Sequence, residues 1–186
     1  MLNRGYAYTT VIQSGDVGKT LLSHLAGHYR HSTTQTWQER LGRGEVTLDG
    51  VAASGGELVT AGQVLVWNRP PWVEEDCPRQ FEVLFEDSHL LAVNKPSGLP
   101  TIPGGGFLEN TLLRLVQARV PEANPVHRLG RGTSGIVLFA KTTRAAAGLS
   151  ADWNTREVEK VYRALGEGVA ERDDYEIATP IGLVGH

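Results

Sequence analysis

The 186-residue sequence predicts an α+β fold, with a small N-terminal unit followed by a larger one. Helical and strand patterns are mixed without a regular strand–helix–strand rhythm, which argues against a doubly wound parallel sheet. The segment 69–80, RPPWVEEDCPRQ, holds three prolines and an acidic triplet and has no apolar periodicity, so it predicts a linker. The chain therefore divides into residues 1–68, the linker 69–80 and residues 81–186.

The first unit is predicted to contain two short helices followed by small strands. Apolar residues recur at helical spacing in its first half, and Ser32 is a residue type that caps helices. The pair Asp49-Gly50 has the chemistry of a tight reversal between strands. In chain order we expect a helix over Lys19–Tyr29, a second helix after Ser32 through Trp37 and Leu41, a strand over Glu45–Leu48 and a closing strand over Gln63–Trp67.

The second unit is predicted to open with a hairpin, because two apolar runs flank Asp87-Ser88. Asn110 can cap a helix that ends before Pro121. Alternation in the segment 160–165 places Tyr162 on one face of a strand. In chain order we expect strands over Phe81–Phe85 and Leu90–Asn94, a helix after Asn110, a strand over Ile136–Ala140, a helix over Thr143–Asn154 and a strand over Lys160–Leu165.

Composition excludes several classes of protein. Cys77 is the one cysteine, so the chain can form neither an internal disulfide nor a cysteine-rich zinc site. No apolar run approaches the ~20 residues of a membrane span, and the N-terminus lacks a signal-peptide core. We therefore expect a reduced, cytoplasmic protein without membrane association.

The charges are unevenly distributed along a chain of formal net charge −3. Between residues 114 and 163, nine Lys and Arg stand against four acids, whereas residues 164–186 hold one Arg and five acids. A basic stretch inside a mildly acidic chain fits a phosphate-facing surface, and it equally fits a solvated face with scattered arginines.

Two other patterns are weak. The segment Gly15–Thr20 resembles the end of a phosphate-binding loop, but Gln13 stands where that motif requires glycine, so we expect a loop that leads into a helix. His24, His28 and His31 share the spacing of one helical face, yet no neighbouring cysteine or acid completes a metal site. An exposed histidine face is the simpler interpretation.

The strongest signal is Val126–Lys141, VHRLGRGTSGIVLFAK. A loop with His127, Arg128 and Arg131 leads through Thr133–Gly135 into an apolar strand. Small and cationic residues at the mouth of a strand are what a backbone-phosphate or flipped-base pocket uses. From the residues alone, a plain basic loop remains the alternative.

This segment resembles the HRLD-x-x-TSG signature of the RluA-type pseudouridine synthases, which isomerise uridine in RNA. Leu84–Asp87 and Leu90–Leu99 resemble that family's opening strands and its Asn-Lys-Pro-x-Gly turn, and the segment 156–165 resembles its later Lys-x-Tyr-x-Ala strand. Residues 1–68 resemble the small alpha-L RNA-binding domain, also found in a ribosomal protein. The resemblance implies this domain followed by the N-terminal part of a mixed-sheet pseudouridine synthase domain.

The resemblance also implies a function. It indicates an RNA pseudouridine synthase that flips a uridine out of structured ribosomal or transfer RNA, works without cofactor or metal, and acts as a monomer. Tyr162 matches the family's active-site tyrosine, which stacks on the target base, and His127 and Arg128 lie where the family contacts RNA. The other RNA-binding candidates are Arg131, Thr133, Ser134 and Lys95.

Two departures from the family pattern bear on activity. The catalytic Asp that follows His-Arg-Leu is replaced by Gly130, which has no side chain to act as nucleophile or base. Acids elsewhere (Asp152, Glu157 or Glu159) can substitute only if the fold brings one to the same place. The family's catalytic domain also continues beyond Pro180–His186, so we expect its C-terminal part to be missing here. The alternative is therefore an RNA-binding homologue without catalysis.

Overall fold

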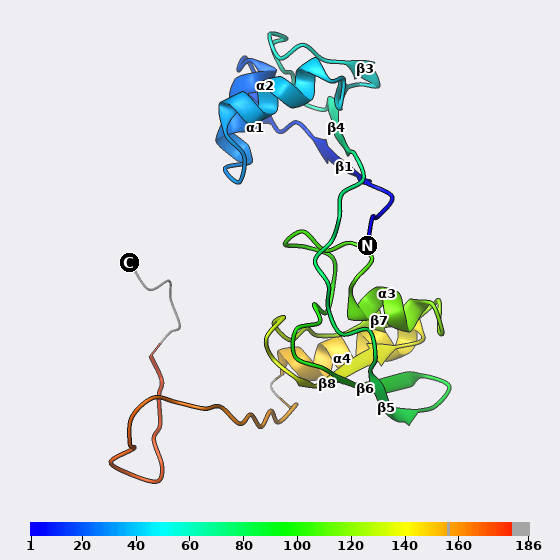
Figure 1. Ribbon diagram of the computed structural model, residues 1–186, viewed down its shortest axis with the longest axis vertical. Coiled ribbons are helices and arrows are strands. Elements are labelled where there is room, and N and C mark those ends of the chain that lie inside the picture. Colours follow the sequence, from blue (N-terminus) through cyan, green and yellow to red (C-terminus); the bar gives the residue numbers. More distant parts are fainter. Residues whose placement is uncertain (156, 180–186) are drawn as a thin grey trace.

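The computed structural model describes residues 1–155 and 157–179, which form two antiparallel sheets with helices packed against them. The strand order is β1-β4-β2-β3 in the first sheet and β5-β6-β8-β7 in the second. The first sheet lies with α1 and α2 at one end of the molecule, and the second with α3 and α4 at the other (Figure 1). This mixture of helices and antiparallel strands confirms the α+β class. Arg156 and Pro180–His186, which entered the sequence comparison above, lie outside the described residues.

The N-terminal sheet is covered by two helices, as predicted. In chain order its elements are β1 (Tyr6–Val11), a short 3-10 turn (Ser14–Asp16), α1 (Leu21–His28), α2 (Thr34–Gly42), β2 (Val46–Leu48), β3 (Val51–Ala52) and β4 (Val64–Arg69). The side chains of Thr20 and Thr33 cap the two helices by accepting hydrogen bonds from backbone amides one turn later. The cap predicted at Ser32 is therefore wrong by one residue, and the Ser32 hydroxyl instead accepts a hydrogen bond from Arg40.

The predicted reversal at Asp49-Gly50 is confirmed. Both residues have positive φ, 51° and 82°, which is the backbone of a tight hairpin turn. The Asp49 carboxylate also accepts a hydrogen bond from the amide of Val64, so it ties the turn to β4. Strand β1 was not predicted, and it pairs along its whole length with β4.

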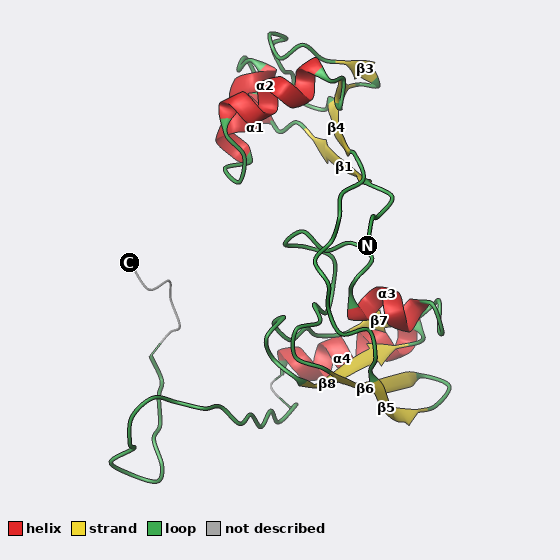
Figure 2. Ribbon diagram, in the orientation of Figure 1, coloured by secondary structure: helices red, strands yellow, loops and turns green. Residues whose placement is uncertain are grey.

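The second unit contains a four-stranded sheet, with one helix between its second and third strands along the chain and another helix after its last strand (Figure 2). Its elements are β5 (Glu82–Glu86), β6 (Leu90–Lys95), α3 (Leu112–Gln117), β7 (Asn124–Pro125), β8 (Gly135–Ala140) and α4 (Thr143–Asn154). The predicted hairpin, the predicted strand before Lys141 and the predicted helix α4 are all confirmed. The cap predicted at Asn110 is wrong by one residue, because the hydroxyl of Thr111 caps α3.

The core of the second unit forms between the central strands and α3. Leu91 and Val93 of β6, Val137 and Phe139 of β8 and Leu112 of α3 are all fully buried. Strand β8 pairs with β6 over its full length, and Gly135 lies opposite Lys95. The residues just before Gly135 therefore lie at the same end of the two strands as the turn that follows Lys95.

The proline-rich segment between the sheets is anchored through Glu74. The Glu74 carboxylate is buried and accepts hydrogen bonds from the Asn3 side chain and from the amides of Glu109 and Asn110. Burial alone would raise the pKa of this carboxyl, but these donors hold it below its ordinary value. The indole of Trp72, in the same segment, donates a hydrogen bond to the carbonyl of Gly106 at 2.6 Å.

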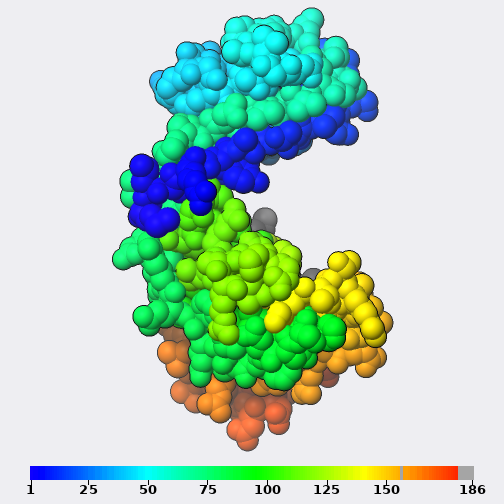
Figure 3. All heavy atoms as spheres, turned by 90° about the vertical axis from the view of Figure 1, so that its right-hand side faces the viewer, coloured from blue at the N-terminus to red at the C-terminus, as the bar shows by residue number. Residues whose placement is uncertain are grey.

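Figure 3 shows the surface hollowed between the N-terminal strand, in blue, and the green and yellow residues of the second unit.

The predicted strand over Lys160–Leu165 is absent. Residues 159–179 are exposed and contain neither helix nor strand. A strand forms only beside a partner strand, and within the described chain no backbone hydrogen bond joins residues 158–179 to either sheet. Alternation in the sequence was therefore not sufficient to make a strand here.

Candidate active site

The turn that carries position 130 is held by the segment that follows β6. The amide of Gly98 donates to the carbonyl of Arg131 at 2.8 Å, and the hydroxyl of Ser97 donates to the carbonyl of Gly132 at 2.8 Å. The hydroxyl of Thr101 bridges both backbone groups of Leu129. These contacts join the turn after β6 to the loop before β8, across sequence separations of 28 to 35 residues.

Lys95 is the central support of this arrangement. Its side chain is fully buried, and the ammonium donates to the carbonyls of Leu99 at 2.6 Å, Pro96 at 2.9 Å and Arg131 at 3.3 Å. Burial lowers the pKa of this ammonium. The structure therefore corrects the expectation that Lys95 binds RNA, because all three of its donors are used inside the protein.

Gly130 is exposed and has room for a side chain. Its φ lies outside the left-handed region, and a Cβ built on it would meet only the Thr133 hydroxyl, at an ordinary contact distance of 3.6 Å. The amide of Thr133 donates to the carbonyl of Gly130, which closes the turn. An aspartate would therefore fit at this position without strain, and glycine is not required by the backbone.

A cavity of about 800 Å³ lies between this turn and the segment that follows α4. Five of the predicted site residues line it: His127, Arg128, Thr133, Ser134 and Tyr162. Gly130, Arg131 and Lys95 are not among its lining residues.

The three acids named as replacements for the family's aspartate differ in whether they line this cavity. Among the described residues that line the cavity, Glu159 is the one carboxylate, whereas Asp152 and Glu157 are not part of the lining. The side chain of Tyr162 is 62% exposed and belongs to the same segment as Glu159. Of the three acids named from the sequence, Glu159 alone therefore lines the same cavity as Tyr162.

His127 is an internal support of the cavity wall. Its Nε2 accepts a hydrogen bond from the amide of Leu138 at 3.0 Å, and its ring stacks on Trp153 with centroids 4.6 Å apart. Burial, together with the nearby charge of Lys160, lowers the pKa of the imidazole. A neutral ring with its acceptor already used is suited to shaping the wall. Trp153, which also lines the cavity, was not singled out from the sequence.

Arg131 is engaged inside the protein. Its guanidinium pairs with the Glu75 carboxylate at 2.8 Å, donates to the carbonyl of Gly98 and lies 4.7 Å from the centre of the Phe107 ring. Arg128, by contrast, is exposed at the cavity and forms no ion pair within the described chain. Of the two arginines predicted to bind RNA, Arg128 is the one placed to meet a phosphate.

The remaining sequence patterns have structural explanations. In the segment Gly15–Thr20, the ammonium of Lys19 pairs with Asp16 at 2.7 Å, and Thr20 caps α1. His24 is buried and its ring stacks on that of His28, so the three histidines do not form a uniformly exposed face.

Among the described residues, no group of three or more His, Cys, Asp or Glu side chains is arranged so that it could hold a metal ion. Nor does any described helix have the length and apolar character to cross a membrane.

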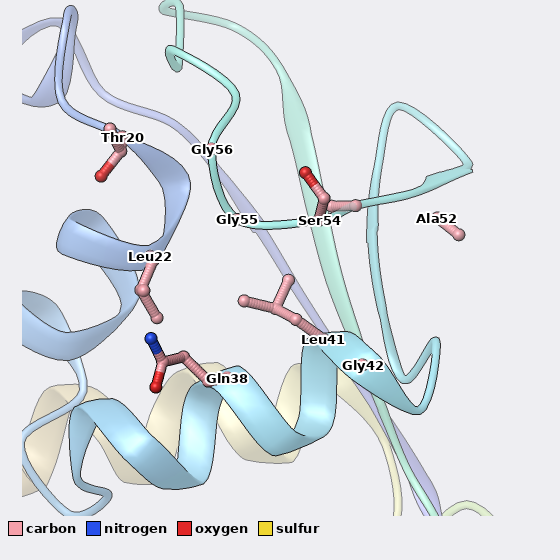
Figure 4. A pocket seen from close by; sticks show the side chains of 10 residues that line it. Thr20, Leu22, Gln38, Leu41, Gly42, Ala52, Ser54, Gly55 and Gly56 are labelled. Carbon is pink, nitrogen blue, oxygen red and sulfur yellow. The ribbon is translucent and has the colours of Figure 1, made fainter.

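The hollow in Figure 4 lies between α1, α2 and the loop after β3. Leu22 and Leu41 extend into it, and Gln38 is its largest polar side chain. A Cβ on Gly55, whose φ is +98°, would lie 2.8 Å from a methyl group of Leu41. The hollow contains no titratable side chain among its lining residues, so it offers packing rather than chemistry.

Comparison with known proteins identifies the family. The family model described as RNA pseudouridylate synthase matches residues 89–183, which include the braced turn and the cavity. This chain belongs to that family. Its relatives place it among the RluA-type pseudouridine synthases.

Two relatives and one solved structure illustrate the match. RNA pseudouridine synthase 5 of Arabidopsis thaliana is 37% identical over 98% of this chain and 58% of its own length. The dual-specificity RNA pseudouridine synthase RluA of Vibrio vulnificus is 43% identical over 54% of this chain and 40% of its own. The structure of human RNA Pseudouridylate Synthase Domain Containing 1 aligns with 45% of this chain and 31% of its own, at 21% identity and a TM-score of 0.36. The chain spans about half the length of the curated relatives it matches.

Proposed function

We propose that this protein isomerises uridine to pseudouridine in structured RNA, ribosomal or transfer, and that the cavity beside the braced turn receives the flipped base. The observation that carries the proposal is the joint lining of one cavity by Arg128, Thr133, Ser134 and Tyr162 in a chain of this family. An exposed aromatic ring stacks on a base with about 1–3 kcal/mol, which offsets part of the cost of taking the base out of its helix. The positive charge of Arg128, which lines the same cavity, attracts the phosphate backbone of the RNA.

The chemistry requires a carboxylate, and we propose that Glu159 supplies it. Isomerisation breaks the bond from uracil N1 to ribose C1′ and forms a bond from C5 to C1′; C5 loses its proton and N1 takes one up, so no atom is gained or lost overall. A carboxylate near the sugar is needed as nucleophile or base, and Gly130 cannot serve. Glu159 lines the same cavity as Tyr162.

A second candidate function, RNA binding without catalysis, is favoured by one observation. The family's aspartate is replaced by Gly130 although the backbone there accepts a side chain. On this alternative, the same cavity binds RNA and the carboxylate has been lost.

The finer assignments belong to the same proposal. Residues 1–68 act as an alpha-L-type RNA-binding domain, 69–80 as a linker and 81–186 as part of the catalytic domain. Two capped helices packed on an antiparallel sheet support the first assignment, and the separate cores of the two units support the division. We also propose a cytoplasmic monomer, for which the single cysteine of the chain is the supporting feature.

The experiment compares the 186-residue chain with three variants on unmodified ribosomal and transfer RNA, with pseudouridine read by carbodiimide primer extension. The wild type is expected to form pseudouridine, Glu159→Gln to lose at least 100-fold in rate, and Gly130→Asp to match or exceed the wild type. Glu157→Gln is the matched control, since that carboxylate does not line the cavity. Activity in Gly130→Asp alone would replace the proposal by the binding-only function. If no protein binds RNA with salt-dependent affinity, both functions are refuted.

A further inference from the structure

A second cavity, of about 510 Å³, lies between the N-terminal sheet and the loop Gly104–Phe107. It is separate from the proposed active site and shares no lining residue with it. Its lining is dominated by aromatic rings and by basic side chain types, of which the two arginines carry positive charge. The aromatic members are Tyr8, Tyr29, Trp37, Trp67 and Phe107, and the basic members are His31, Arg40 and Arg69.

The aromatic wall is a direct result of the register between β1 and β4. Tyr8 lies opposite Trp67 in this antiparallel pair, and their rings stack with centroids 5.1 Å apart and 19° between planes. Because side chains alternate along a strand, Leu65 and Arg69 share the face of Trp67. Leu65 is buried in the core, while Tyr8 is 43% exposed. One sheet face therefore begins in the hydrophobic core and ends as an accessible aromatic surface.

Two arginines, Arg40 and Arg69, stack on tryptophan rings at this surface. The Arg40 guanidinium lies 4.1 Å from the Trp67 ring centre and 4.4 Å from that of Trp37. Arg69 lies 3.5 Å from the Trp72 ring centre. Within the described chain neither arginine forms an ion pair, and no acid lines the cavity. Glu45, which lies outside the cavity lining, partly offsets the charge of Arg40, but the lining itself supplies cations and no acid, which favours an anionic occupant.

The opposite wall offers backbone donors without side chains. Gly104 and Phe107 exchange two backbone hydrogen bonds, which closes the loop. The amides of Gly105 and Gly106 donate no hydrogen bond within the described residues. Because glycine has no side chain, an anion can approach these amides closely. Phe107 also contacts Arg131, so this wall is joined to the turn that carries position 130.

We propose that this second cavity binds an unpaired nucleotide of the RNA, with its base on the Tyr8–Trp67 pair and its phosphate between Arg69 and the glycine amides. The inference rests on the proposed function, because it takes RNA as the substrate. An unpaired nucleotide is the occupant that combines a flat apolar face with a negative charge, and the two walls complement those properties. A duplex keeps its bases stacked inside and does not offer that face.

The test measures binding of a six-nucleotide single-stranded oligoribonucleotide to the full chain by fluorescence anisotropy. Tyr8→Ala is expected to weaken binding about 5- to 100-fold, as for loss of one stacked base, and Tyr8→Phe to restore it. Tyr8→Thr also removes the ring but keeps strand propensity, so it serves if the alanine variant does not fold. Tyr175→Ala removes an exposed tyrosine outside both cavities and should leave binding unchanged.

The outcomes separate this inference from the proposed function. If Tyr8→Ala binds the oligonucleotide like the wild type while Tyr162→Ala loses it, the oligonucleotide occupies the other cavity and the inference is overturned. Equal affinity for the oligonucleotide and for a duplex of the same length also overturns it. Pseudouridine formation by the wild type, measured separately, shows whether the proposed function survives such a failure.

Discussion

The two walls of the proposed active site differ in how they are supported. The turn around position 130 is braced by hydrogen bonds from Ser97, Gly98 and Thr101, with the buried ammonium of Lys95 beneath it. The opposite wall, residues 158–163, carries Glu159 and Tyr162 and has no strand partner in the described chain. Stability and chemistry are thus expected to respond to different residues: the braced wall preserves the fold, and the exposed wall meets the substrate.

The largest effect on stability is expected at Lys95. Lys95→Met leaves the carbonyls of Pro96 and Leu99 without their donor, at about 1–3 kcal/mol for each carbonyl that water cannot reach, whereas the carbonyl of Arg131 keeps the Gly98 amide. We expect the free energy of unfolding in urea to fall by about 3 kcal/mol. Lys19→Met removes only an exposed ion pair and should cost less than about 1 kcal/mol. Equal losses of unfolding free energy in the two variants would show that the hydrogen bonds from Lys95 do not stabilise the turn around position 130.

An intermediate effect is expected at His127. His127→Phe keeps a ring against Trp153 but leaves the Leu138 amide without its acceptor, which should cost about 1–3 kcal/mol. Burial lowers the pKa of this imidazole, so below the ordinary value of 6.5 the unfolded chain takes up a proton before the folded one does. Stability should therefore fall as pH decreases below 6.5, and this part of the fall should be missing in the variant. The measurement is urea unfolding from pH 7.5 to 5.5; identical pH dependence in both proteins would contradict the assignment.

The sequence predicted local elements well and long-range pairing poorly. Helix α4 was predicted at its observed bounds, Thr143–Asn154, because its alanine-rich pattern follows a capping threonine and needs no distant partner. Strand β1 was missed since its identity depends on β4, more than fifty residues away. The strand predicted over Lys160–Leu165 was wrong because a strand depends on its partner: the alternating pattern is present, but no described strand lies beside it.

The site was predictable to the extent that it is contiguous in sequence. The segment 127–134 stood out as a cationic, glycine-rich loop before a buried strand, and the structure places that loop at a cavity. Lys95 was grouped with the RNA-binding candidates because it lies in the turn that resembles the family's Asn-Lys-Pro-x-Gly turn, whereas the carbonyls that bind it come from separate segments. The aromatic cavity of the N-terminal unit was missed entirely, because Tyr8 and Trp67 meet only through the register of β1 and β4.

The smallest effect on stability is expected at Tyr162, where the effect on chemistry should be large. This side chain is 62% exposed, so Tyr162→Ala should change the free energy of unfolding by less than about 0.5 kcal/mol. The decisive measurement is tritium release from RNA labelled at uracil C5, by the wild type and by Tyr162→Ala in parallel. We expect steady release by the wild type and a rate about 5- to 100-fold lower in the variant. Equal rates in the two proteins, or no release by the wild type, would contradict the account.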